Sequence, residues 1–121
     1  MTISTQAILT DVVYGVPSGN YDGSSQDWAS DGVKAANYYR GQGNVQSLAV
    51  RTTGFDGIMY LEATLDADAQ TATWFTTQIY GDGSSALTNY VVFTVTGNFT
   101  WMRARVEGFA GGTINSVAIT Y

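Results

Sequence analysis

The segment from Val91 to Tyr121 constrains the fold of this chain more than any other part of the sequence. Three runs rich in β-branched and aromatic residues follow one another there, separated by Gly97-Asn98 and by the stretch from Gly108 to Gly112. Glycine and asparagine at these positions can adopt the backbone conformations that tight turns need. The pattern predicts an antiparallel sheet in which the C-terminal residues form a strand.

Similar runs recur upstream at intervals of about ten residues, the spacing typical of sandwiches and barrels. The predicted strands are Val45 to Arg51, Ile58 to Leu65, Thr71 to Ile79, Tyr90 to Thr96, Thr100 to Glu107 and Thr113 to Tyr121. Turns are predicted at Thr53 to Gly57, Asp66 to Gln70, Gly81 to Ser85, Gly97-Asn98 and Gly108 to Gly112. We therefore expect one all-β domain over residues 1–121, an antiparallel β-sandwich with a jelly-roll-like arrangement.

Alternation of side chains divides these runs into two faces. The apolar face is expected to form the core and comprises Met59, Leu61, Ala63, Leu65, Val91, Phe93, Val95, Met102, Ala104, Val106, Val117, Ile119 and Tyr121. The opposite face comprises Tyr60, Glu62, Thr64, Trp101, Arg103, Arg105 and Glu107. Agreement among several independent runs favours this arrangement over any single-strand interpretation.

The N-terminal part of the chain is less regular. Gln6 to Tyr14 predicts one or two strands, and Pro17 to Ser25 has the composition of an exposed loop. Gly32 to Tyr39 fits either a strand or a short helical turn, and we expect a strand.

Composition excludes several classes of function. Only 12% of the residues are charged and the net charge is −5, so the five scattered cations cannot neutralise a run of phosphates. We therefore expect no nucleic-acid partner. We also expect no membrane partner, because the same cations are too sparse to bind an anionic membrane surface and no apolar run is long enough to span a bilayer. The absence of cysteine and histidine rules out disulfides, thiolate metal sites and Ser–His–Asp triads. Residues 1–6 lack the basic and apolar regions of a signal peptide, so we expect no signal-directed export.

Acidic residues are the remaining candidates for chemistry. Asp66 and Asp68 share one loop, where aspartates form turns far more often than they form the carboxylate pair of a glycosidase. We therefore predict no enzyme, no catalytic residue and no cofactor. Asp22 and Asp27 offer the hard oxygen ligands that calcium prefers and are the candidate metal ligands.

Aromatic residues exceed what one core of this size needs. Trp28, Tyr38 and Tyr39 are candidate glycan contacts, because exposed aromatic faces can stack on sugar rings; Tyr60, Trp74 and Trp101 add to the excess. Trp101, Arg103 and Arg105 share one face and are the candidate interface residues. In a purely structural alternative, Trp101 closes an edge of the sandwich and the two arginines pair with Glu62 or Glu107.

Four segments together carry a family resemblance, which covers about the second half of the chain. They are Phe55 to Leu65, Trp74, Thr96 to Val106 and Gly112 to Tyr121. This combination resembles small virion structural proteins of tailed phages of marine bacteria, including cyanophages. The resemblance implies a β-sandwich present in many copies in the particle, as a capsid decoration or as a neck- or tail-associated component. It implies partners that are further copies of the chain and other virion proteins, and it carries no catalytic residues.

The sequence thus predicts a non-enzymatic, homo-oligomeric virion structural protein located in the particle. The alternative is a carbohydrate-binding module or an adhesin for host-surface glycans.

Overall fold

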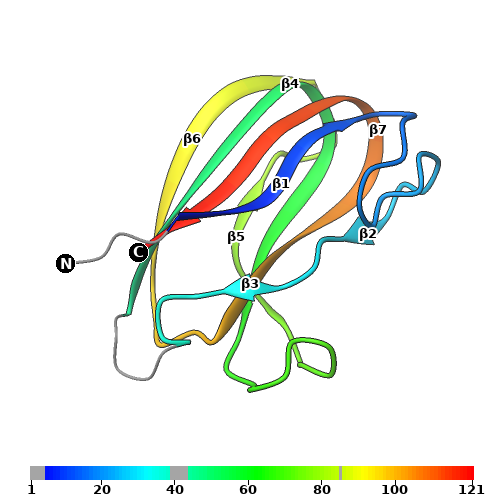
Figure 1. The fold of residues 1–121 in the computed structure, drawn as a ribbon. Helices are drawn as coiled ribbons and strands as arrows, with labels where there is room; N and C mark the ends of the chain where they lie inside the picture. Colours follow the sequence, from blue (N-terminus) through cyan, green and yellow to red (C-terminus); the bar gives the residue numbers. More distant parts are fainter. Residues whose placement is uncertain (1–4, 39–43, 85) are drawn as a thin grey trace.

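The computed structural model describes residues 5–38, 44–84 and 86–121 (Figure 1). Its strands are β1 (Thr5–Val13), β2 (Trp28–Ala29), β3 (Val33–Lys34), β4 (Val45–Thr64), β5 (Phe75–Tyr80), β6 (Leu87–Thr96) and β7 (Trp101–Thr120). All strand pairs are antiparallel and belong to one sheet, which confirms the predicted all-β class. The finer arrangement, a β-sandwich of jelly-roll type, stays a prediction. In the described part of the chain, no helix is long and apolar enough to cross a membrane.

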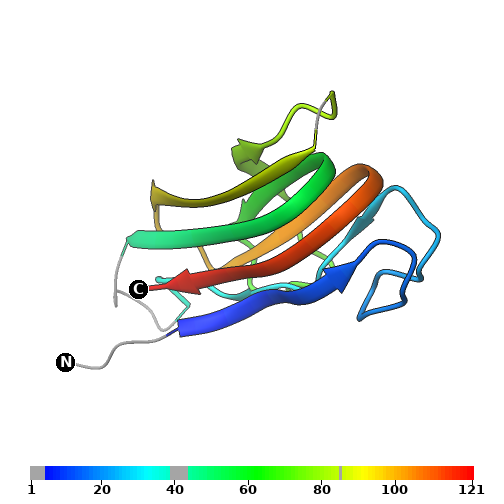
Figure 2. The same cartoon turned by 90° about the horizontal axis from the view of Figure 1, so that it is seen from above.

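The sheet has two halves because β4 and β7 are each 20 residues long and pair with each other along most of their length. In one half, the start of β4 pairs with β6, and the end of β7 pairs with β1. In the other half, the end of β4 pairs with β5, and the start of β7 pairs with β2 and β3. We call these the β6 half and the β5 half. Both long strands arch from one half to the other (Figures 1 and 2).

The two glycine-rich stretches predicted as turns at 53–57 and 108–112 lie instead inside β4 and β7, and that part of the prediction is wrong. Register shifts fall between Thr53 and Asp56 and again between Asp56 and Ile58. Because the two irregular stretches lie opposite each other in paired strands, with Asp56 beside Gly111, both strands bend together and the ladder resumes beyond them. The predicted strands 45–51 and 58–65 are therefore both parts of β4, and the predicted strands 100–107 and 113–121 are both parts of β7.

The core lies inside the bend. Met59, Leu61 and Ala63 are buried, as are Met102, Ala104, Val106, Val117 and Ile119, which confirms the predicted apolar face at these positions. Leu65 is the exception at 65% exposed, because β4 ends at Thr64 and the chain leaves the sheet there. Glu62 and Thr64 on the opposite face are buried as well, whereas Tyr60, Trp101, Arg103 and Arg105 on that face are partly exposed.

The N-terminal segment closes the space between the two halves. The side chain of Gln6 donates to the carbonyl of Lys34, and the amide of Ala36 donates to Oε1 of the buried Gln46 (3.1 Å). The prediction of a strand within Gln6 to Tyr14 is confirmed by β1. Two expectations fail here. The loop from Pro17 to Ser25 is not wholly exposed, because Tyr21 is fully buried. The strand expected from Gly32 is only β3, after which the backbone turns at residues 36–38.

Candidate ligand-binding groove

An ion-pair ladder occupies the outer face of the β5 half. Glu62 on β4 lies beside Arg103 on β7, and its Oε1 accepts from Arg103 Nε at 2.9 Å. Its Oε2 accepts from Arg105 Nε at 3.0 Å. The Glu62 side chain is only 7% exposed, whereas those of Arg103 and Arg105 are 24% and 31% exposed. One buried carboxylate thus organises two partly exposed guanidinium groups.

Aromatic rings fix the same two arginines from the side. The guanidinium of Arg103 lies 4.5 Å from the ring centroid of Trp74, and that of Arg105 lies 4.2 Å from Tyr60. Arg105 also forms a close ion pair with Glu107. Burial by itself lowers the pKa of Arg105, but the hydrogen bonds to Glu107 and Glu62 outweigh it, so its pKa is raised. Each arginine is therefore held by an anion and by a ring.

The loop between β4 and β5 forms one wall beside this ladder. Its backbone is shaped by aspartates: Asp66 accepts from the amide of Thr73 at 2.7 Å, and Asp68 accepts from the amide of Gln70 at 2.9 Å. These bonds confirm that both residues form turns, as expected. The indole of Trp101 donates to the carbonyl of Ala67 at 3.0 Å, which ties the loop to β7.

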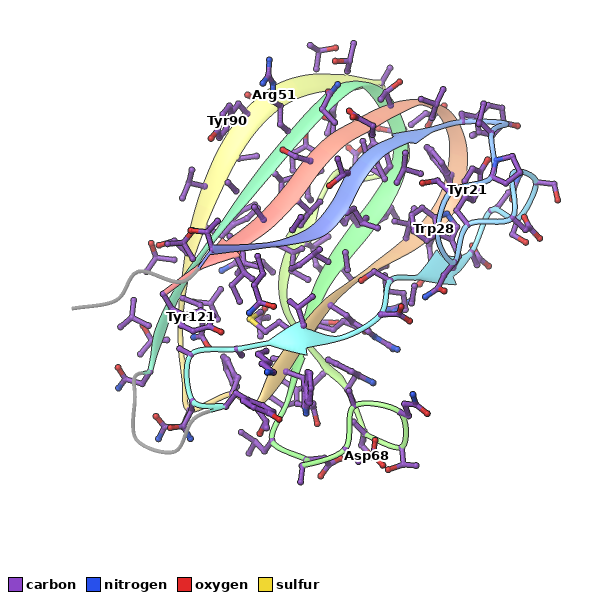
Figure 3. The ribbon with its side chains drawn as sticks, in the orientation of Figure 1. Tyr21, Trp28, Arg51, Asp68, Tyr90 and Tyr121 are labelled. Atoms are coloured by element: carbon purple, nitrogen blue, oxygen red, sulfur yellow. The ribbon has the colours of Figure 1, made fainter. Side chains whose placement is uncertain are left out.

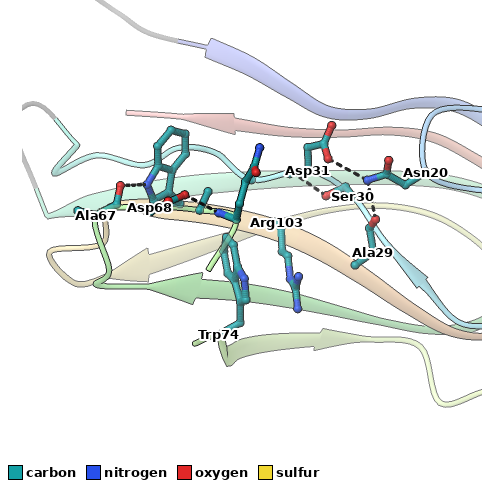
Figure 4. Close-up of a pocket in the computed structure, with 12 residues that line it drawn as sticks. Asn20, Ala29, Ser30, Asp31, Ala67, Asp68, Trp74 and Arg103 are labelled. Carbon is teal, nitrogen blue, oxygen red and sulfur yellow. Dashed lines mark hydrogen bonds between the residues drawn. The ribbon is translucent and has the colours of Figure 1, made fainter. Parts of the chain in front are cut away.

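The opposite wall comes from the chain around β2 and β3. The side-chain amide of Asn20 donates to the carbonyl of Ala29 and to Oδ1 of Asp31, both at 3.0 Å. Between the walls lies a groove of about 760 Å³ (Figure 4). It is lined by Asn20, Ala29, Ser30, Asp31, Gly32, Ala67, Asp68, Ala69, Gln70, Trp74, Trp101 and Arg103. Two indole rings thus share one open surface with amide, carboxylate and guanidinium groups.

The predicted interface residues are brought together on one face. The pairing alternative is confirmed as well, because Arg103 and Arg105 bind Glu62, and Arg105 also binds Glu107. The expected edge position of Trp101 is wrong: it lies within the sheet, opposite Lys34 on one side and Thr64 on the other. No external partner is needed to neutralise these two arginines.

The predicted aromatic platform is largely not formed. Trp28 is 8% exposed and packs against Tyr21 and Phe109, so its rings cannot meet a sugar, and that part of the prediction is wrong. Tyr38 is half-buried, with its ring 4.9 Å from that of Trp101. Tyr39 lies outside the described residues. The indole rings that line the groove are instead those of Trp74 and Trp101, which are brought to it because β7 and the β4–β5 loop meet.

The candidate calcium ligands stabilise loops. Asp22 Oδ1 accepts from the amides of Ser24 and Ser25 at 2.8 and 2.7 Å, and these bonds, Ser24 first, lower its pKa to about 2. Asp27 accepts from the amide of Gly108 at 3.0 Å. Within residues 5–38, 44–84 and 86–121, no three acidic side chains gather as a metal site would require.

Comparison of the chain with protein-family models, with curated proteins and with solved structures found no significant match. The groove is therefore interpreted from its own geometry. Sequence reasoning missed Asn20, Asp31 and Gln70 as lining residues. They lie in three separate turn-like stretches, and only the pairing of distant strands brings them together.

Proposed function

We propose that the chain is a non-enzymatic carbohydrate-binding domain and that the groove between Trp74, Trp101 and Asp31 is its binding site. The observation that carries the proposal is the presence of two partly exposed indoles beside convergent polar groups on one open surface. A sugar ring presents C–H groups on its faces and hydroxyls at its rim. The C–H groups can pack on flat aromatic rings, and the hydroxyls can form hydrogen bonds with amide or carboxylate groups.

Rigidity of the two rings supports the proposal. Trp101 is fixed by its hydrogen bond to Ala67 and by the ring of Tyr38, and Trp74 is fixed by the guanidinium of Arg103. Side chains that are already ordered lose little rotamer freedom when a ligand binds, which favours affinity for weakly interacting ligands such as sugars.

The polar groups favour binding over catalysis. Asp31 accepts from Asn20 and Asp68 accepts from the Gln70 backbone, so each groove carboxylate already has a structural task. Both Asp31 and Asp68 are exposed residues. A general acid in a glycosidase instead sits where burial raises its pKa.

A glycan array followed by calorimetry with the best oligosaccharide tests this proposal. Trp101→Ala and Trp74→Ala should each weaken binding at least about tenfold, as expected for aromatic hot spots. Tyr90→Ala is the matched control, because Tyr90 is 63% exposed on β6 and does not line the groove. Unchanged affinity in both tryptophan variants, or the absence of any glycan ligand, would sink the proposal.

A second candidate is a structural role in a phage particle, as a capsid decoration or as a neck- or tail-associated component. The resemblance of the second half of the chain to virion proteins suggests it, and the uncharged exposed strand β6 favours it, since such a strand suits assembly. Its partners would be further copies of the chain and other virion proteins. Quantitative mass spectrometry of purified particles tests it: many copies per particle are expected, and absence from the particle contradicts the role. Glycan binding and a place in a particle are compatible.

A further inference from the structure

Strand β6 forms an open border of the sheet. It pairs with β4 on one side, and no strand in the described part of the chain pairs with its other side. In Figure 1 it is the outermost strand of the β6 half. At 10 residues, it presents a long row of backbone donors and acceptors.

The register identifies which backbone groups face outward. The amide of Gly97 donates to the carbonyl of Asn44 at 2.7 Å, one position beyond the pair Thr96–Val45. Hydrogen-bonded and non-bonded pairs alternate along an antiparallel ladder. The residues of β6 that bond to β4 are therefore the odd-numbered ones. The outward amides and carbonyls belong to Thr88, Tyr90, Val92, Thr94 and Thr96.

Strand β6 has little to protect this edge: of its outward amides, that of Tyr90 donates to Oδ1 of its neighbour Asn89 (2.8 Å). Residues 87–96 contain no proline and no charged residue, although the chain as a whole carries a net charge of −5. Tyr90 and Val92 are 63% and 59% exposed. Natural edge strands are usually blunted by charges, proline or bulges. Strand β1, at the opposite border, has two such features: a register shift between Ala7 and Leu9, and Asp11 with a φ of 48°.

We propose that the occupant of this edge is β6 of a second copy, paired antiparallel across a two-fold axis at Val92. This register places Val92 opposite its own copy, Tyr90 opposite Thr94, and Thr88 opposite Thr96. Each pair exchanges two hydrogen bonds through the outward groups, and the Tyr90 amide leaves Oδ1 of Asn89 for the carbonyl of Thr94 in the second copy. The result is a sheet continuous across two molecules, a closed association that needs no third subunit.

The side chains fit this register. It matches an aromatic residue with a β-branched one, valine with valine and threonine with threonine, which are favourable cross-strand pairs. Arg51 lies beside Tyr90 on the neighbouring strand, and both project outward from the sheet (Figure 3). In this register, Arg51 lies in line with Tyr90 and with Thr94 and Ser47 of the second copy. Arg51 and its symmetry copy are therefore far apart. No like charges face each other.

Sedimentation equilibrium over a range of concentrations tests the proposal with two edge variants. Val92→Pro removes an outward amide and leaves the ladder to β4 intact, and Thr94→Lys adds a charge at the edge. Each should weaken dimerisation at least about tenfold relative to the unmodified chain. Thr120→Lys is the control, because Thr120 lies on the interior strand β7, opposite Ser47. It should dimerise like the unmodified chain.

Hydrogen exchange read by NMR separates this dimer from any other. In the unmodified dimer, the amides of Val92 and Thr94 should be protected, and in Thr94→Lys the amide of Val92 should become fast. The Tyr90 amide is not used as a reporter, because it already donates to Oδ1 of Asn89 within one chain. Val91 and Phe93 should stay protected in both, which also reports that the variant is folded. A chain that stays monomeric at every concentration overturns the proposal. So does a dimer whose outward amides remain fast.

Discussion

At the scale of single residues, Glu62 contributes most to the groove, although it does not line it. Its carboxylate is almost fully buried and accepts from two arginines, one of which also stacks on Trp74. Loss of the negative charge would leave two guanidinium groups close together without the anion that separates them. The position of Trp74 in the groove therefore depends on an acidic residue beneath it.

Glu62→Gln is expected to lower the free energy of unfolding by about 1–3 kcal/mol, less than for a fully buried pair because both arginines are partly exposed. Urea denaturation followed by circular dichroism gives the value. Glu107→Gln is the matched control, since the Glu107 side chain is 41% exposed. Its effect should stay below about 1 kcal/mol. Equal effects of the two variants would contradict the anchoring role of Glu62.

Asp22 gives a pH dependence whose sign follows from its lowered pKa. The carboxylate form binds the amides of Ser24 and Ser25, so the folded loop holds the pKa at about 2, below the ordinary value of 3.8. The stabilisation is fully present above pH 3.8 and is lost as the pH falls through about 2. A carbon-detected NMR titration should show this midpoint, with the Ser24 and Ser25 amide shifts moving in parallel. A midpoint near 3.8 would show that the turn does not form.

At the scale of elements, the bends of β4 and β7 decide the shape of the sheet. Gly54 and Gly112 lie against each other with φ values of 63° and 85°. A Cβ added to Gly112 would lie 2.1 Å from the carbonyl oxygen of Gly54, closer than any atom can approach. The close approach of β4 and β7 at this bend thus requires glycine at position 112 for two reasons: the positive φ and the lack of space for a Cβ.

Gly112→Ala is expected to destabilise the fold by more than about 3 kcal/mol, because a backbone clash adds to the cost of a left-handed conformation. Gly108→Ala is the control, with a φ of 63° and no atom within 4 Å of an added Cβ. It should lose only about 1–2 kcal/mol. Thermal unfolding measured for both proteins compares them directly. A similar loss in both would mean that the strands can separate at the bend.

The same elements show how far sequence patterns reach. Alternation identified the buried residues of the long strands, because side-chain direction is a local property of an extended backbone. Glycine content correctly marked positive φ at Gly54 and Gly112. Glycine content could not distinguish a turn from an irregularity inside a strand. The difference depends on whether the paired strand bends at the position opposite, which is a tertiary property. Tyr21 was misplaced for a related reason, since its burial depends on where distant segments pass. Leu65 was misplaced because β4 ends one residue earlier than predicted.

At the scale of the whole molecule, the two halves should behave as one folding unit. Strands β4 and β7 run through both, so neither half can lose its pairing while the other keeps a complete sheet. We therefore expect a single cooperative unfolding transition.

The chain offers separate probes for the two halves. All three tryptophans lie on or beside strands of the β5 half, so indole fluorescence reports that half. Exchange of the amides of β1 and of the β4-facing residues of β6 reports the other half. The free energies from the two probes should agree in urea. Two separate transitions would show that the bend acts as a hinge between independent units.

The sequence by itself determined the all-β class, the faces of the longest strands and the positive φ of Gly54 and Gly112, and it excluded thiol and histidine chemistry. All of these depend on residue identity or on neighbours within a few positions. Only the tertiary structure decided which aromatic rings are accessible. Trp28 and Trp101 were both candidate surface aromatics in the sequence, yet one is buried against Phe109 and the other lines the groove. The groove and the open edge of β6 arise from pairing between residues far apart in the chain, which no local pattern encodes.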